Sequence, residues 1–130
     1  MTSKARLGAF IAPLALLATM TTAHAQGTPA DADGQQRWLT IVNRSNVPIY
    51  RVHMTDVDTR TWGPDVLGRR IVDPGEATRV YPQRVQSDRG YCRFDVLVVF
   101  ENNARYEQRQ VNICRATTVV CSSTRSCRIQ

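Results

Sequence analysis

The sequence has almost no lysine and little histidine. Lys4 is its only lysine, and His24 and His53 are its only histidines. A lysine Schiff base or a histidine-activated nucleophile therefore has few residues to draw on. No serine lies in the Gly-x-Ser-x-Gly pattern that positions a nucleophile. We predict that the protein is not an enzyme and that it has no catalytic residues.

Metal-binding patterns are equally weak. The spacing of Cys121 and Cys127 does not match a zinc site, which needs several Cys or His ligands. The aspartates Asp56, Asp58 and Asp65 suggest a calcium loop, but they do not fit the spacing of an EF-hand. They could form an irregular calcium site or cap turns, with capping favoured. We predict no metal and no cofactor.

The first 25 residues have the three-part pattern of a secretory signal peptide. A basic start at Lys4 and Arg6 leads into the apolar stretch Leu7–Thr19, and an Ala-His-Ala triplet ends at Ala25. The apolar stretch is shorter than the roughly 20 residues of a transmembrane helix. We expect cleavage after Ala25, a flexible leader over Gln26–Gln36, no membrane span in the mature chain, and residence in the periplasm or outside the cell.

The remaining residues, 37–130, are predicted to form a single β domain. All four cysteines lie here, and an even number in a small exported chain favours two disulfides. The whole chain has a net charge of +6, but the arginines form no nucleic-acid-binding motif with interleaved aromatic residues. We therefore expect no nucleic-acid partner.

Alternation of apolar and polar residues predicts most of the strands. Between Ile49 and Val57, for example, Tyr50, Val52 and Met54 fall on one face. The strand from Phe94 to Phe100 is apolar on both faces, which is typical of a central strand. Five or six strands without helical periodicity favour an all-β fold. Specifically, we predict a small antiparallel β-sandwich, immunoglobulin-like in the broad sense and stapled by disulfides.

A hairpin links the two most continuous strands and suggests one disulfide. Asn102 and Asn103 suit a tight turn. A two-residue turn would place Cys92 opposite Ile113, and a longer turn or a bulge would place it opposite Cys114. Both registers favour a Cys92–Cys114 bridge and leave Cys121 to pair with Cys127. The other two pairings remain open.

A long loop, Asp56–Asp73, separates two of the strands. Trp62 and Leu67 are its expected anchors in the core, because a loop of this length must pack against something. If the protein binds a partner, the loop around Trp62 and Asp65, or an edge strand at Arg105–Ile113, is the expected contact. The Pro-Gly pair ending at Gly75 predicts a type II turn.

The order of these features resembles a group of small secreted bacterial proteins of unknown function. The shared pattern is a Trp-Gly loop at Trp62, a Pro-Gly turn at Gly75, and a hairpin clamped by Cys92 and Cys114. Where the pattern has Asp-Gly at the hairpin turn, this chain has two asparagines. The resemblance implies an exported β domain and brings no activity, substrate or site residue with it.

We therefore expect an exported, non-enzymatic binding or interaction module. Its partner would be an envelope or extracellular protein or a glycan. One alternative is a small hydrolase of envelope polysaccharide that uses His53 with aspartates. Another is a secreted protease inhibitor that presents the disulfide-framed segment Ser122–Ser126.

Overall fold

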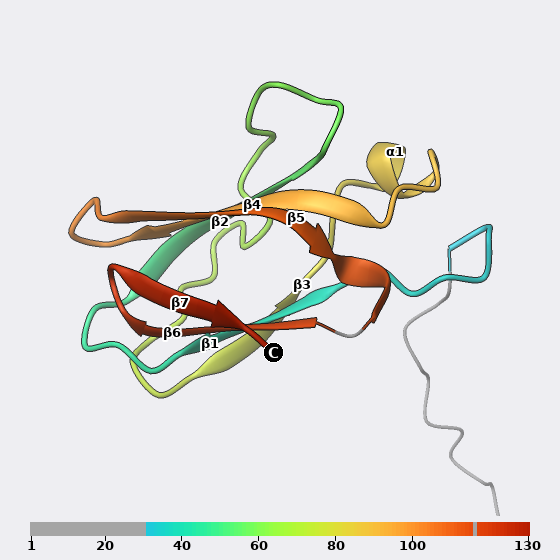
Figure 1. Ribbon diagram of the computed structural model, residues 1–130. Helices are drawn as coiled ribbons and strands as arrows, with labels where there is room; N and C mark the ends of the chain where they lie inside the picture. Colours follow the sequence, from blue (N-terminus) through green and yellow to red (C-terminus); the bar gives the residue numbers. More distant parts are fainter. Residues whose placement is uncertain (1–30, 116) are drawn as a thin grey trace, which may run out of the picture.

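The computed structural model describes residues 31–115 and 117–130, which form two stacked β-sheets (Figure 1). The predicted signal peptide and the first residues of the predicted leader lie outside the described residues. One sheet has four strands in the order β3-β1-β6-β7, and the other has three in the order β2-β4-β5. The strands are β1 (Leu39–Asn43), β2 (Ile49–Asp56), β3 (Ala77–Val80), β4 (Arg93–Phe100), β5 (Arg105–Asn112), β6 (Thr117–Ser123) and β7 (Ser126–Ile129). The predicted disulfide-stapled, all-β sandwich is confirmed.

One strand pair departs from the antiparallel expectation. β1 pairs antiparallel with β3 but parallel with β6, with Leu39 opposite Thr117. A parallel pair needs a long crossover between its strands. Here all three strands of the other sheet lie between β1 and β6 in the sequence. This connection is long enough for β6 to run parallel to β1.

The core lies between the sheets, and β4 is central in the three-stranded sheet, as predicted. Phe94 and Phe100 point into the core, and Leu97 on the opposite face is also only 2% exposed. β2 shows one difference from the predicted alternation. Its register shifts between Ile49 and Arg51, so Ile49 is buried and Tyr50, expected on the core face, is exposed.

The hairpin between β4 and β5 has a three-residue loop, the longer of the two turns that the sequence left open. The N–H of Phe100 donates to the carbonyl of Ala104, which closes the loop. A bulge then shifts the pairing by one residue between Phe94 and Val96. Loop and bulge together leave Cys92 opposite Ile113, whose N–H donates to the Cys92 carbonyl.

Both disulfides have the pairing that the sequence favoured. Cys92 is bonded to Cys114, and Cys121 is bonded to Cys127. The second bridge joins β6 and β7, two strands that lie where the sequence suggested only a stapled tail. A short helix, α1 (Arg84–Ser87), likewise occupies a segment expected to be loop. The type II turn is confirmed, since Gly75 has φ +90° and the Glu76 N–H donates to the Asp73 carbonyl.

Residues just before β1 are tied to the domain by a buried arginine. The side chain of Arg37 is fully buried and forms ion pairs with Asp31 at 2.8 Å and with Asp33 at 2.6 Å. Its Nε donates to the carbonyl of Tyr91, next to the first disulfide. Because Asp33 accepts from Arg37, the pKa of Asp33 falls from 3.8 to about 2. This part of the predicted leader is thus held to the domain by specific contacts. No helix among the described residues is long and apolar enough to span a membrane.

Candidate functional site

The segment that follows β2 rises above the outer face of the three-stranded sheet and then returns beside β2 (Figure 1). Asp65 Oδ1 accepts the N–H groups of Val52 and Leu67, at 2.9 and 3.0 Å. The N–H of Val66 donates to the carbonyl of Val52. Leu67 is 3% exposed and belongs to the core, as predicted. The returning half of the loop is therefore fixed to the edge of the sheet.

Two outward side chains of β2 hold the first half of the loop. His53 Nδ1 lies 2.7 Å from the carbonyl oxygen of Gly63, so Nδ1 donates a proton there. The Thr55 hydroxyl donates to the Thr61 carbonyl and accepts the N–H of Gly63. His53 is thus half-buried under the loop, not an exposed strand residue. Among the described residues, its side chain has no hydrogen bond to a serine or to a carboxylate.

Trp62 lies on the outer surface of the sheet, not in the core. Its ring is half-buried, and the guanidinium carbon of Arg109 sits 5.2 Å from the ring centroid. The expectation that Trp62 anchors the core is therefore wrong. Gly63 and Thr61, held by His53 and Thr55, keep this part of the loop on the outer face, so of the two expected anchors Leu67 reaches the core and Trp62 does not.

A β-bulge positions the arginine beneath Trp62. Asp95, which is 9% exposed, lies opposite both Arg109 and Gln110. Its carboxylate accepts the N–H of Gln110 at 3.0 Å and the Arg109 guanidinium at 2.7 Å. Gln110 has φ +55°, a backbone conformation unusual for a residue other than glycine. The bulge re-aims the strand, as bulges near functional sites commonly do.

The charges around Arg109 fix its guanidinium in place. A second carboxylate, that of Glu107, lies 2.9 Å from the other terminal nitrogen. These acceptors, Asp95 above all, raise the pKa of Arg109 above its ordinary value. Arg109 therefore keeps its charge under Trp62, with part of its surface open to solvent.

Trp62 and Arg109 border a small hollow of about 210 Å³, a volume that includes the solvent at its mouth. Its cavity proper is only about 30 Å³, far below the roughly 300 Å³ of a typical small-molecule site. Guanidinium groups, threonine hydroxyls and one carboxylate line it: Thr55, Thr59, Arg60, Thr61, Asp95 and Arg109 with Trp62. The hollow can accept the tip of one polar side chain or a backbone carbonyl. We call the hollow and its rim the Trp62 site.

The three aspartates of the suspected calcium loop point to separate partners. Asp56 is buried and accepts the N–H groups of Asp58 and Thr59, which caps a turn. Asp58 accepts the Tyr91 hydroxyl, and this hydrogen bond raises the pKa of Tyr91. Asp65 holds the loop at β2, as described above. Among the described residues, no three His, Cys, Asp or Glu side chains are placed to hold a metal ion.

Two other segments were expected to contact a partner: the edge strand at Arg105–Ile113, which borders the Trp62 site, and Ser122–Ser126, which lies away from it. β5 is an edge strand, and it supplies Arg109. The segment Ser122–Ser126 forms the turn between β6 and β7, in the other sheet. Asp95, Thr55 and Arg109 were not connected to Trp62 in the sequence, because they come from three strands that only the fold brings together.

The architecture defines a small, disulfide-stapled, all-β domain. No protein-family model matches the chain, and no curated protein matches it. A solved structure with a similar shape is the NMR structure of a protein from Eubacterium rectale, with a TM-score of 0.48 at 8% sequence identity. The match covers 78% of this chain and 93% of that one.

Proposed function

We propose that the protein is an exported, non-enzymatic binding module that contacts an envelope or extracellular protein through the Trp62 site. Two disulfides fit an oxidising environment, and the signal-peptide pattern of the sequence agrees with export. Residence in the periplasm or outside the cell is part of the same proposal.

The observation that carries the proposal is the stacked pair of Trp62 and Arg109 on a fixed framework. Tryptophan and arginine are enriched among the residues that dominate protein–protein binding. Binding costs side-chain entropy when such residues must be ordered, and fixing them beforehand lowers that cost. Here Asp95 and Glu107 hold Arg109, while His53 and Thr55 hold the loop that presents Trp62.

The chemistry of the Trp62 site favours an acceptor group on the partner. Arg60 is exposed beside the hollow, and the side chain of Arg109 is 61% exposed despite its two carboxylate partners. Both can donate to a carbonyl or carboxylate that enters the hollow while apolar atoms of the partner cover the Trp62 ring.

Capture of a partner by the oxidised protein tests the proposal. Residues 26–130, with both disulfides formed, serve as bait for an envelope extract of the host, and captured proteins are identified by mass spectrometry. We expect a partner that soluble bait competes away and that the Trp62→Ala variant no longer captures. Because Trp62 lies outside the core, the variant should remain folded, with a melting temperature within a few degrees of the wild type.

The Tyr50→Ala variant is the matched control, because Tyr50 is another aromatic side chain on the surface, 42% exposed, at the other end of β2. It should capture the partner like the wild type. If Trp62→Ala and Tyr50→Ala capture equally well, the Trp62 site is not the contact. If Trp62→Ala unfolds, the residue is a structural anchor and the proposal loses its main support.

The two alternatives from the sequence have less support. For a hydrolase, His53 would need a serine or a carboxylate as partner, but among the described residues its side chain bonds the Gly63 carbonyl and neither of these, and the nearby hollow is small. For a protease inhibitor, Ser122–Ser126 would have to present an extended loop. Ser123 pairs with Ser126, so the segment is a tight turn.

A further inference from the structure

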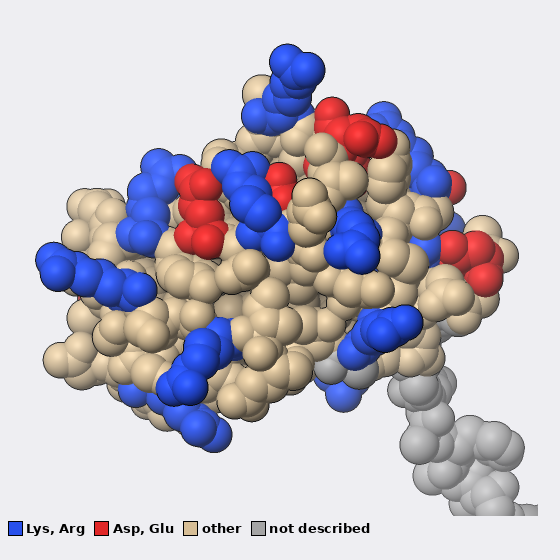
Figure 2. Space-filling view, viewed as in Figure 1, with Lys and Arg blue, Asp and Glu red and all other residues tan. Residues whose placement is uncertain are grey.

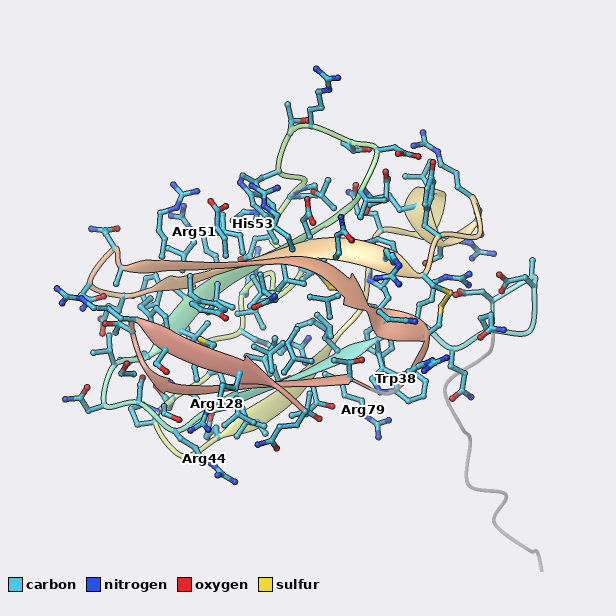
Figure 3. The ribbon with its side chains drawn as sticks, viewed as in Figure 1. Trp38, Arg44, Arg51, His53, Arg79 and Arg128 are labelled. Carbon is cyan, nitrogen blue, oxygen red and sulfur yellow. A yellow bond between two sulfur atoms is a disulfide. The ribbon has the colours of Figure 1, made fainter. Side chains whose placement is uncertain are left out.

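The outer face of the four-stranded sheet carries several arginines. Leu39, Ile41 and Val80 point into the core, so the residues that alternate with them point outward. Figure 3 shows the labelled arginine side chains of this sheet on the side away from the other sheet. We call this surface the basic face and define it by six outward residues: Trp38, Thr40, Arg44, Arg79, Thr118 and Arg128.

The positive charge of the basic face is not neutralised locally. Arg44, Arg79 and Arg128 are exposed, and none of them takes part in an ion pair among the described residues. The arginines that do form ion pairs among the described residues are Arg37, Arg84, Arg89 and Arg109, none of which belongs to the basic face. Figure 2 shows blue and no red along the lower edge of the molecule, on the side where β6, β7 and β1 lie.

The acidic residues nearest in sequence lie at one border of the basic face. Asp73 and Glu76 belong to the turn before β3, which is bonded to Asn43, and the Glu76 carboxylate accepts the N–H of Asp73. Neither carboxylate is within ion-pair distance of Arg44. Arg79 and Arg128 lie on the strands, away from this turn.

One arginine of the basic face is oriented in advance. The guanidinium carbon of Arg79 lies 5.1 Å from the centroid of the Trp38 ring. Stacking on an aromatic ring orders the planar guanidinium and leaves its N–H groups able to bind a carboxylate with two parallel hydrogen bonds. Trp38 is therefore a positioning residue for Arg79.

The spacing of the arginines favours a polymer over a small anion. With strands about 4.8 Å apart and residues about 3.3 Å apart along a strand, the pairing places the three arginine Cα atoms roughly 12–16 Å from one another. A single carboxylate or phosphate cannot bridge them. An extended polyanion that lies across the strands can contact all three.

The groups beside Arg79 favour a sugar polymer, and the outward Val42 and Val120 lie next to Arg128. Thr40 and Thr118, paired across β1 and β6, supply hydroxyls, and Tyr81, which follows the inward-pointing Val80, is 41% exposed at the Trp38 end. Hydroxyls and an exposed ring suit a chain that carries its own hydroxyl groups. We propose that the basic face binds an acidic polysaccharide through its carboxylates. This inference uses a different surface from the Trp62 site and does not depend on it.

Binding of alginate, a polymer of carboxylated sugars, tests the inference. The intact, oxidised protein is titrated at low salt with alginate, with neutral dextran, with polyglutamate and with vesicles of anionic phospholipid. We expect binding to alginate that weakens as salt is added, weaker binding to polyglutamate and to the vesicles, and none to dextran.

Exposed arginines without ion pairs can be replaced at little risk to the fold. Arg79→Gln and Arg128→Gln should each weaken alginate binding by about two- to fivefold, the range of a single exposed ion pair. The combined Arg44→Gln, Arg79→Gln and Arg128→Gln variant should lose at least about tenfold. Arg105→Gln, which removes the same charge from an exposed position on the other sheet, should change binding less than twofold.

The role of Trp38 has its own readout. Trp38→Leu should weaken binding as much as Arg79→Gln does, and Trp38→Tyr should restore it, because an aromatic ring again supports the guanidinium. Arg128→Gln keeps the test decisive even if Trp38→Leu does not fold.

Three results would overturn the inference. They are equal loss in the Arg105→Gln control, equal or tighter binding of polyglutamate, and preferential binding to the vesicles. The last two would assign the face to an acidic polypeptide or to a membrane surface. Capture through the Trp62 site would remain unaffected by any of these outcomes, so the two proposals can fail separately.

Discussion

Asp95 should be among the most sensitive polar positions of the domain. Its carboxylate accepts the N–H of Gln110, which the bulge leaves without a strand partner, and it also holds Arg109. A hydrogen bond to a charged group contributes about 1.5–3 kcal/mol when buried. The ion pair adds less, about 0.2–1 kcal/mol, because Arg109 is 61% exposed. Asp95→Ala should therefore lower the free energy of unfolding by about 2–3.5 kcal/mol.

Urea denaturation at pH 7 with both disulfides intact measures this loss. The midpoint should fall while the slope of free energy against urea stays constant, since the native surface changes little. By thermal unfolding, the same loss corresponds to a drop of roughly 10–20 °C for a domain of this size. Asp95→Asn, which keeps the acceptor for Gln110 and loses the charge, should lie between the wild type and Asp95→Ala.

Glu107→Gln is the control, because Glu107 bonds the same arginine from an exposed position and has no contact with the bulge N–H. It should change the free energy of unfolding by less than about 0.5 kcal/mol. If Asp95→Ala and Glu107→Gln prove equally mild, the carboxylate does not hold the bulge, and the account of how Arg109 is positioned fails.

Two further predictions concern the disulfides and the acid stability. The first is tested by mild reduction of the native protein, followed by alkylation and mass spectrometry. Cys92 and Cys114 should be labelled first, because thiol exchange needs access to the sulfur and Cys121 and Cys127 belong to the buried core. Earlier labelling of Cys121 would contradict this. The pKa of Asp33 is about 2 when folded, against 3.8 ordinarily, so its contribution to stability is complete above about pH 5 and is lost as the pH falls through 2. Asp33→Asn should therefore be less stable than the wild type at pH 7 and nearly equal at pH 2 in thermal unfolding; parallel curves would refute the assignment.

The three-stranded sheet could be read from the sequence because its information is local. β4 and β5 are joined by a short hairpin, and the apolar residues on both faces of Phe94–Phe100 place this strand at the centre. The sequence-based predictions differ from the structure where one extra residue in a strand or turn changes which face the following side chains occupy. Tyr50 is exposed because β2 shifts register beside it, and the bulge at Gln110 compensates for a hairpin loop one residue longer than a two-residue turn. Such register shifts arise when two strands pair, and the residue pattern of one strand alone does not reveal them.

The four-stranded sheet was less predictable because it is assembled from distant segments. β6 and β7 contain serines, threonines and cysteines in place of a clear apolar alternation, so they resembled a tail. The Trp62 site was missed for a similar reason. Trp62 itself was a candidate, but nothing near it in the sequence indicates Arg109 or Asp95, which reach it only through the bulge in β5.

The parallel pairing of β1 with β6 has a consequence for how the chain acquires its structure. β1 precedes the other described strands in the chain, yet one of its two neighbours is β6, which follows the whole three-stranded sheet, with Leu39 opposite Thr117. Contacts between residues so far apart in the chain slow folding, because a long loop must close before they are gained. The four-stranded sheet therefore cannot be completed until β6 has been synthesised and can reach β1.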